Sequence, residues 1–370
     1  MNQRERLTAT LNGAPVDAVP WYADLTYWHS AHERTCDLDE RYRGADGLLR
    51  LHRDLGVGVY LFTPPLVRVN RDPEIFRRET EHVEPGVTLT RILSPAGVLT
   101  SVSRELPGSG TSAVLEWPVK TVDDLAVVRS WYEAATYEAN YDEVLACDRT
   151  WGDAGHGIPL TPRTPLAALA AEWCGVTALS YLATDHQNEL EGTLRAMESA
   201  EDELYQLTEA APVPAVEIPD NLSAETMTGL WRRYSRDYYK KRIAGLHRSG
   251  KLVGCHIDGT LGKLLGELVR AGVDFPESVV PAPVGDLELE QIRAETSPET
   301  IIWGCVPGAM FAPPYEPDFV LEFVRRVVQV LGSTGRLVMA SADQVPPNGD
   351  ITLVRRIGEE LERIGPPSYR

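Results

Sequence analysis

The second half of the chain alternates between short apolar segments and longer amphipathic ones, and this alternation limits the possible folds most strongly. The apolar segments, typical of buried strands, lie at 214–218, 251–256, 273–279, 300–305 and 336–341. The segments with apolar residues three and four positions apart, typical of helices, lie at 223–249, 260–271, 286–296, 318–331 and 350–363. Successive strand–helix units with short connections require a parallel sheet. We therefore predict an α/β fold, a distorted TIM (β/α)8 barrel, with an open doubly wound sheet as the alternative.

The first half contains fewer regular units. Residues 1–60 are predicted to be an N-terminal helical segment with a strand at Trp21–Leu25, and a second, fully apolar strand is expected at 56–62. Two runs of alternating residues, 87–93 and 98–103, flank a Ser-Pro-Ala-Gly turn and predict an antiparallel hairpin within an insertion at about 76–119. A long amphipathic helix is expected from Asp185 to Ala210. We expect all of this to form one domain spanning 1–370.

Composition excludes several classes of protein. Hydrophobic residues make up 43% and charged residues 24% of the chain, as in ordinary globular proteins. The net charge of −18 argues against a nucleic-acid partner. No apolar run is long enough to cross a membrane, and no signal peptide is evident. Five scattered cysteines predict reduced thiols, so we expect a cytoplasmic protein.

The segment Lys251–Gly259 carries the strongest functional signal. It is a short apolar strand that ends at His256 and Asp258, followed by a glycine turn. Residues two apart in a strand project to the same face, so both side chains are expected to converge at the carboxyl end of the strand. A carboxylate beside an imidazole fixes its tautomer and raises its basicity. This pair is suited either to acid–base catalysis or to metal binding.

Other strand ends also carry polar groups, which parallel packing would gather at one face. These are Asp24, Glu217 with Asp220 and Asn221, Glu277, Cys305 and Asp343. Polar residues at strand ends also occur because loops are solvated and helices need caps. For Asp286 and Asp350 we favour capping, whereas for Glu277 the two interpretations are balanced. Trp21, Tyr22 and Trp303 are candidates to line an aromatic substrate pocket, although such residues are more often core.

Over nearly its whole length the chain resembles the uroporphyrinogen decarboxylase superfamily, which includes cobalamin-linked methyltransferases. The opening Arg4–Trp21 is similar to the family's first helix and its Gly-x-Pro-x-Asp-x-x-Pro entry into the first strand. The segments Tyr239–Gly259, Ile302–Pro307 and Leu337–Pro347 are similar to the family's histidine-bearing strand and its two closing strands. The resemblance implies a distorted TIM barrel, often dimeric, with its active site at the carboxyl ends of the strands.

Two departures separate the chain from true uroporphyrinogen decarboxylases. Those enzymes carry Met-Arg-Gln-Ala-Gly-Arg-Tyr after the first strand, and its arginines bind substrate carboxylates. Here the same place reads Trp21–Trp28 without an arginine, and Ala342–Gln344 replaces the family's Gly-His-Gly. A porphyrinogen with eight carboxylates would meet acids where it needs cations, which argues against a role in heme biosynthesis.

The methyltransferase branch binds zinc through His-x-Cys and a later cysteine. In this chain Asp258 and Asp343 stand at the cysteine positions, so the resemblance implies a metal site of His256, Asp258 and Asp343. Zinc is the expected ion, with Mn²⁺ also compatible with oxygen donors. The first hypothesis is accordingly a metal-dependent small-molecule methyltransferase with a corrinoid or folate-type methyl donor. Because no corrinoid-binding domain is evident, a corrinoid would require a separate partner protein.

In this hypothesis Glu217 or Asp24 orients or deprotonates the acceptor, and Asn221, Cys305 and the aromatic residues contact it. The second hypothesis is a metal-free decarboxylase or lyase, in which His256 and Asp258 act as the acid–base pair on a small carboxylate. It needs a cation to hold the substrate, and Arg91, Arg163 and Lys263 are the candidates. The third hypothesis is a barrel that binds a ligand or a partner protein without catalysis.

Overall fold

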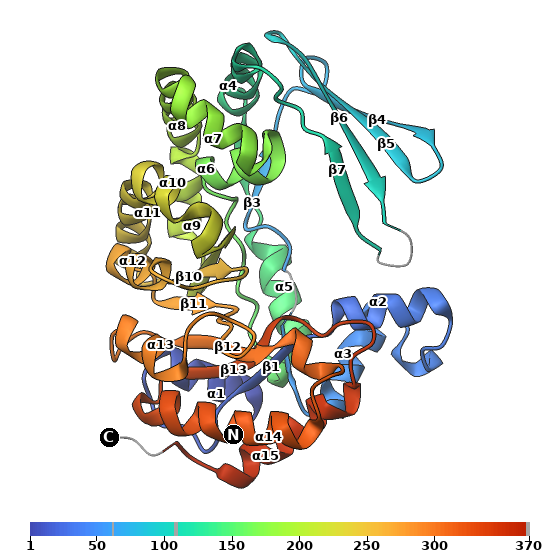
Figure 1. Ribbon diagram of the computed structural model, residues 1–370, viewed down its shortest axis with the longest axis vertical. Helices are drawn as coiled ribbons and strands as arrows, with labels where there is room; N and C mark the ends of the chain where they lie inside the picture. The colour runs from blue at the N-terminus through green and yellow to red at the C-terminus, as the bar shows by residue number, and fades with distance from the viewer. Residues whose placement is uncertain (61–62, 107–109, 368–370) are drawn as a thin grey trace.

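The computed structural model of the chain describes residues 1–60, 63–106 and 110–367. Its centre is made of parallel strands in two sheets (Figure 1). The four-stranded sheet has the order β12 (Ile302–Pro307), β13 (Leu337–Gln344), β1 (Trp21–Asp24) and β2 (Gly58–Val59). The three-stranded sheet has the order β11 (Phe275–Glu277), β10 (Leu252–Ile257) and β9 (Ala215–Leu222). All strand pairs in both sheets are parallel, which confirms the α/β prediction.

Isolated bridges extend this series of strands. Val279 pairs with Gly304 and links the end of β11 to β12, while Leu160 pairs with Glu217 at the outer edge of β9. Within the described residues, no pairing joins β2 to the segment around Leu160, so the series does not close into a barrel. The expected strand at 56–62 is represented by β2, and its residues 61–62 lie outside the described part of the chain.

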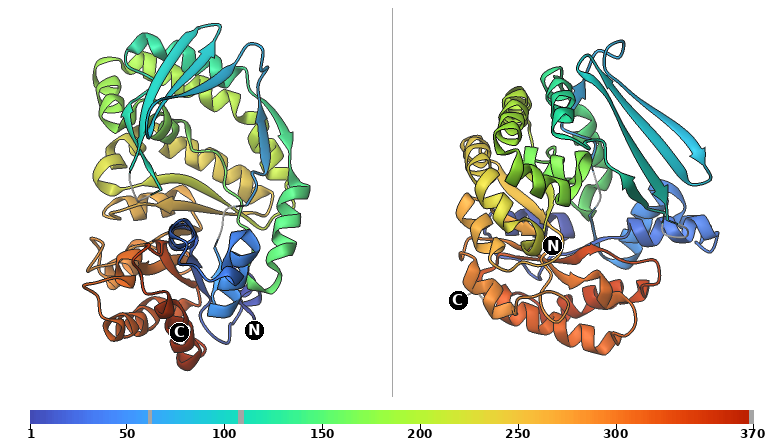
Figure 2. Two further views of the ribbon diagram at one scale, coloured as in Figure 1. Left: turned by 90° about the vertical axis from the view of Figure 1, so that its right-hand side faces the viewer. Right: turned by 45° about the horizontal axis from the view of Figure 1, so that its top comes forward.

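Helices surround these strands, and α11, α12, α14 and α15 pack against the strands that position the site (Figures 1 and 2). The helices are α1 (Gln3–Leu11), α2 (Thr26–Thr35), α3 (Gly44–Leu55), α4 (Leu125–Glu133), α5 (Tyr141–Trp151), α6 (Pro165–Ala168), α7 (Gly175–Asp185), α8 (Gln187–Ala200), α9 (Asp202–Ala210), α10 (Ala224–Tyr234), α11 (Arg236–Arg248), α12 (Leu264–Ala271), α13 (Leu289–Glu295), α14 (Pro317–Leu331) and α15 (Ile351–Ile364). None of the described helices combines the length and the apolar character that a membrane span requires.

The expected hairpin is the centre of a larger antiparallel sheet. Its strands, in order, are β4 (Arg77–Glu84), β5 (Val87–Ser94), β6 (Gly97–Glu105) and β7 (Ser112–Glu116). Ile92 and Leu99 are buried on the face that covers α4, whereas β4 is exposed along its whole length. The sheet stands at the end of the molecule away from α14 and α15 (Figures 1 and 2). A short pair of strands, β3 (Val67–Asn70) and β8 (Thr136–Ala139), lies between it and the parallel strands.

Two long helices expected from the sequence are each divided in the structure. The segment 185–210 forms α8 and α9, which meet at Glu201, and the segment 223–249 forms α10 and α11, which meet at Ser235. Both junction residues are buried, and Tyr238 donates a hydrogen bond of 2.5 Å to the Glu201 carboxylate. The spacing of apolar residues could not predict these interruptions, because the apolar face of each helix continues across the single junction residue.

The packing of β10 against β11 leads to a test of the fold. A Cβ atom added at Gly254 would lie 1.9 Å from Cε2 of Phe275, which is fully buried. We expect Gly254→Ala to lower the free energy of unfolding in urea denaturation by about 1–3 kcal/mol, because the core must shift to admit the methyl group. The control is Gly192→Ala in α8, where a Cβ would meet nothing within 4 Å. That change should raise stability by about 0.5–1 kcal/mol. Equal stability of the two variants would contradict this packing.

Candidate active site

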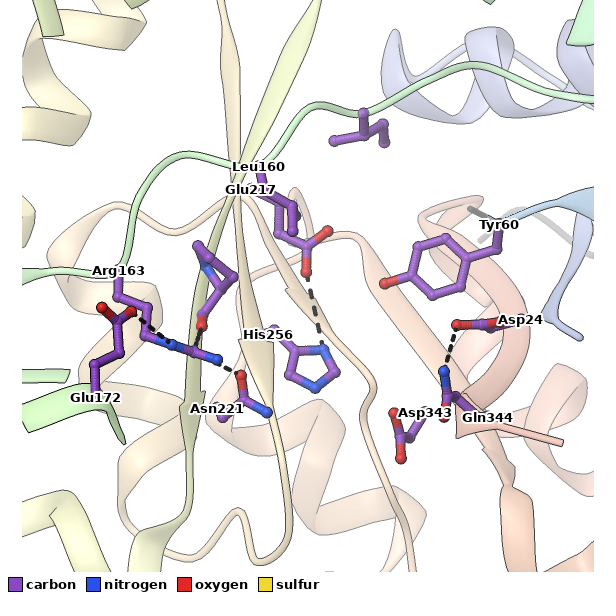
Figure 3. Close-up of a pocket in the computed structure, with 12 residues that line it drawn as sticks. Asp24, Tyr60, Leu160, Arg163, Glu172, Glu217, Asn221, His256, Asp343 and Gln344 are labelled. Carbon is purple, nitrogen blue, oxygen red and sulfur yellow. Dashed lines mark hydrogen bonds and ion pairs between the residues drawn. The ribbon is translucent and has the colours of Figure 1, made fainter. Parts of the chain in front are cut away.

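A cavity of about 400 Å³ opens where the parallel strands end (Figure 3). This volume lies within the usual range of small-molecule sites, roughly 300–1,000 Å³. It is lined by Asp24, Tyr60, Ile158, Leu160, Arg163, Glu172, Glu217, Pro219, Asn221, His256, Asp343 and Gln344. Residues from β1, β9, β10 and β13 thus meet in one place, as expected of carboxyl ends in a parallel arrangement.

Strand pairing places His256 between two buried glutamates. In the parallel register, His256 on β10 lies opposite Glu277 on β11. Gly254, two residues earlier on β10, lies opposite Glu217 on β9. The Nδ1 atom of His256 is 2.5 Å from Oε2 of Glu277 and 3.9 Å from Oε1 of Glu217. The glutamate side chains are 0% and 3% exposed, respectively. Three adjacent strands therefore build one histidine–carboxylate cluster.

The buried charges change the acid–base properties of this cluster. Burial raises the pKa of Glu217 well above its usual range, and the charge of Glu277 raises it further. Burial alone would lower the pKa of His256, but the charge and hydrogen bond of Glu277, followed by the charges of Glu217 and Asp343, raise it to about 9. These shifts favour the protonated form of His256, an imidazolium that can donate a proton.

The same cluster has the arrangement of a metal-binding group. Among the described residues, Glu217, His256 and Glu277 offer ligand atoms that all lie within 4.8 Å of one another. The Oε1 atom of Glu277 is buried and has no hydrogen-bond partner within the described part of the chain. Such an unpaired buried oxygen is costly, and a bound cation would satisfy it.

Of the residues predicted for catalysis and binding, the structure brings Asp24, Glu217, Asn221, His256 and Asp343 together around the cavity. Hydrogen bonds fix the Asp24 carboxylate, which accepts them from the amide and hydroxyl of Thr26, at 2.7 and 2.5 Å, and from Gln344 at 3.0 Å. Burial raises the pKa of Asp24, and these hydrogen bonds oppose that increase.

Asp258 does not join His256 in the cavity. Strand β10 ends at Ile257, and its pairing with β9 shifts register between Cys255 and Ile257. Asp258 is consequently exposed, outside the cavity lining, and its nearest partner is the Asn221 amide at 3.5 Å. The predicted metal set was His256, Asp258 and Asp343. Only His256 belongs to the group of three possible ligands described above, and Asp343 lines the cavity without joining that group.

The predicted substrate contacts Trp21, Tyr22, Trp303 and Cys305 are buried and do not line the cavity. Trp21 donates a hydrogen bond from its indole to the Val354 carbonyl, and the Tyr22 hydroxyl donates to the Gln3 carbonyl. Trp303 supports the site indirectly, because its ring packs against Tyr60 with a centroid distance of 6.1 Å.

The sequence reasoning did not identify Tyr60 and Glu172 as site residues, and it could not place Arg163. Tyr60 lies directly after β2, so its strand-end position was the available signal. Arg163 comes from the irregular segment before α6, and Glu172 from the short π-helix Leu169–Trp173 that follows it. Glu277 was noted as a strand-end carboxylate without being assigned to the site. Of the other basic candidates, Arg91 pairs with Glu81 on the antiparallel sheet, and Lys263 does not line the cavity.

Several strand ends adopt strained backbone conformations. Asn221, Ser278, Cys305 and Asp343 have positive φ angles of 51°, 62°, 76° and 65°. Non-glycine residues rarely adopt this left-handed region, and it is most accessible to Asn and Asp. Two of these four residues, Asn221 and Asp343, line the cavity. Strain of this kind clusters at functional sites, which supports the cavity as the active site.

Comparison with protein-family models and with curated sequences gives no match. Among solved structures, the fold is similar to that of a methyltransferase from Methanosarcina mazei, with a TM-score of 0.59. The match covers 98% of this chain and 99% of that chain, at 14% sequence identity. At this identity the likeness shows a shared fold over the full length of both proteins.

The raised pKa of His256 predicts how stability depends on pH. Because the folded pKa of about 9 exceeds the ordinary value of 6.5, protonation of His256 stabilises the folded state below pH 6.5, and this contribution is lost as the pH rises through 9. In urea denaturation between pH 6.5 and 9, the wild type should lose more stability than His256→Gln. A control, His82→Gln on the exposed strand β4, should behave like the wild type. Parallel pH profiles of the wild type and His256→Gln would contradict the predicted proton binding.

Proposed function

We propose that this chain is a metal-dependent methyltransferase that acts on a small molecule. The observation that carries the proposal is the convergence of Glu217, His256 and Glu277, of which Glu217 and His256 line the cavity. The similarity in fold to a methyltransferase over the whole chain is compatible with it. The proposed active site is the cavity, with Asp24 and Asn221 positioned to orient the substrate.

The three donors fit a divalent ion by their chemistry. They supply one imidazole nitrogen and carboxylate oxygens, a donor set that Zn²⁺ and Mn²⁺ both accept. The unpaired Oε1 atom of Glu277 is the observation that supports a cation at this position. When bound, such an ion would act as a Lewis acid and lower the pKa of an acceptor group. The metal set proposed here shares only His256 with the His256, Asp258 and Asp343 set implied by resemblance.

The remaining parts of the proposal concern the methyl donor and partners. We propose a corrinoid or folate-type donor, with a separate protein carrying the corrinoid if that is the donor. In either case the residues of this chain would hold and orient the acceptor. The three hydrogen bonds that fix Asp24 prevent it from turning away, so its free lone pairs remain directed to one position.

A second function, a metal-free decarboxylase or lyase, is favoured by one specific observation. Arg163 lines the same cavity as His256, so a cation is available to hold a substrate carboxylate. In that reaction the protonated His256 would donate its proton to the carbanion left by the departing group, with Glu277 holding the imidazole in place. Full turnover by protein stripped of metal ions would favour this function over methyl transfer.

Metal binding is the direct test of the first function. After dialysis against Zn²⁺ or Mn²⁺ and removal of excess, elemental analysis should find a stoichiometric ion in the wild type. Glu277→Gln should bind it about 10- to 100-fold more weakly, because it loses one carboxylate oxygen at the cluster. His256→Ala should lose the ion, whereas His82→Ala, on the exposed strand β4, should retain it. A wild-type protein without a stoichiometric ion would contradict the proposal.

A further inference from the structure

One side of the cavity is built around a fixed cation. Arg163 donates hydrogen bonds from Nη1 to the Pro219 carbonyl and, at 3.0 Å, to Oδ1 of Asn221. Its Nε atom lies 3.6 Å from Glu172. These three partners hold the guanidinium in one orientation, and Nη2 has no hydrogen bond to the described residues. Among the described residues that line the cavity, Arg163 is the only arginine or lysine, so an anionic group would find its partner here.

The opposite side carries a carboxylate that no hydrogen bond from the described residues fixes. Figure 3 places Asp343 and Tyr60 on one side of His256 and Arg163 on the other. The Asp343 side chain lines the cavity and accepts no hydrogen bond from the part of the chain that the structure describes. Asp24, on the same side, accepts three hydrogen bonds. Asp343 is the carboxylate on this side that accepts none from the described residues.

Tyr60 adds an aromatic surface to this negative side. Its ring packs against Trp303, which holds it beside the cavity. A carboxylate combined with an aromatic ring is a suitable environment for an ammonium or other onium group, through ion pairing and cation–π attraction. Apolar contacts from Ile158 and Leu160 complete the lining.

The cluster of Glu217, His256 and Glu277 lies between the Arg163 side and the Asp343 side of the cavity (Figure 3). With a bound divalent cation it would add no net charge to either side. Two carboxylates, Glu217 and Glu277, together with a neutral imidazole would balance a divalent cation. A purely anionic ligand would therefore meet Asp343 uncompensated, and a purely cationic one would leave Arg163 without a new partner. A ligand with both charges, one at each end, satisfies both sides of the cavity.

We propose that the cavity binds a small zwitterion, with its carboxylate on Arg163 and its ammonium or other onium group between Asp343 and Tyr60. The inference deepens the proposed function by giving the substrate class of the same site, and it rests on that function for the identity of the site. Arg163 and Asp343 are specificity-determining residues in this arrangement.

The test compares three ligands of related shape by isothermal titration calorimetry on the wild-type chain. Glycine betaine carries both charges, 3,3-dimethylbutanoate replaces its nitrogen with carbon and so lacks the cation, and choline lacks the carboxylate. Glycine betaine should bind at least about tenfold more tightly than either analogue, because only it forms both charged contacts. This comparison uses wild-type protein and does not depend on the folding of any variant.

Variants then assign each end of the ligand. Arg163→Gln should abolish the preference for glycine betaine over choline, and Asp343→Asn should abolish the preference over 3,3-dimethylbutanoate. Asparagine tolerates the positive φ angle of Asp343, so the second change preserves the backbone. The matched controls are Arg91→Gln on the antiparallel sheet and Asp142→Asn on the exposed side of α5, and both should retain wild-type selectivity.

Any of three results would overturn the inference. They are equal binding of the three ligands, no detectable binding of glycine betaine at millimolar concentration, and unchanged selectivity in both cavity variants. Each titration is made on metal-free and on Zn²⁺-loaded protein. Selective binding by a protein that holds no metal would support the inference while contradicting the proposed metal dependence. A stoichiometric metal ion without selectivity for the zwitterion would do the opposite.

Discussion

The contact between His256 and the buried carboxylates of Glu217 and Glu277 is the interaction on which the site depends. Removing a carboxylate from water costs several kcal/mol unless its charge is compensated. Here the compensation comes from the imidazole of His256, which lies 2.5 Å from Glu277. A chain that needed only a stable core would gain more from apolar residues at these positions. Their presence in the interior is therefore best explained by chemistry that requires a cation or a proton at this place.

Strand pairing determines where this chemistry occurs. Glu217, His256 and Glu277 lie on the adjacent strands β9, β10 and β11, and their registers bring the side chains to one level. Glu217 and His256 line the cavity, together with Pro219 and Asn221 from the later part of β9. Asn221 and Asp343, which have positive φ angles, are the second-last residues of β9 and β13, and both line the cavity. The strained backbone, the buried carboxylates and the cavity therefore occur together on the same set of strands.

Several strand-end residues that line the cavity could be predicted from the sequence, whereas the contacts among their side chains could only partly be predicted. Strand ends are recognisable as apolar runs that stop at a polar residue, which identified Asp24, Glu217, His256 and Asp343. The partner of His256 was harder to predict, because two-residue periodicity holds only while the strand continues. Strand β10 ends before Asp258, and the carboxylate that contacts His256 is Glu277 from the neighbouring strand. Long-range register of this kind is set by tertiary packing, which a single sequence does not show.

Arg163 illustrates a second reason why sequence reasoning was incomplete. It belongs to an irregular segment, and its position depends on three partners from separate parts of the chain, at Glu172, Pro219 and Asn221. The aromatic residues illustrate the opposite error, since Trp21, Tyr22 and Trp303 occur near strand ends but are buried in the core. Large aromatic side chains contribute most when buried, so their proximity to a strand end is weak evidence of ligand contact.

The two aspartates that stand where the resemblance implied sulfur ligands have different surroundings in the structure. Resemblance placed Asp258 and Asp343 at the cysteine positions of a zinc site, but only Asp343 lines the cavity. In the structure the donors that converge with His256 come instead from the strands on either side of it, Glu217 and Glu277. A cation held there would lie among three adjacent strands and would not need Asp343. That carboxylate is then free to face the ligand, opposite Arg163, so the departure from the thiolate pattern would change both the metal donors and the charge of the molecule that the cavity selects.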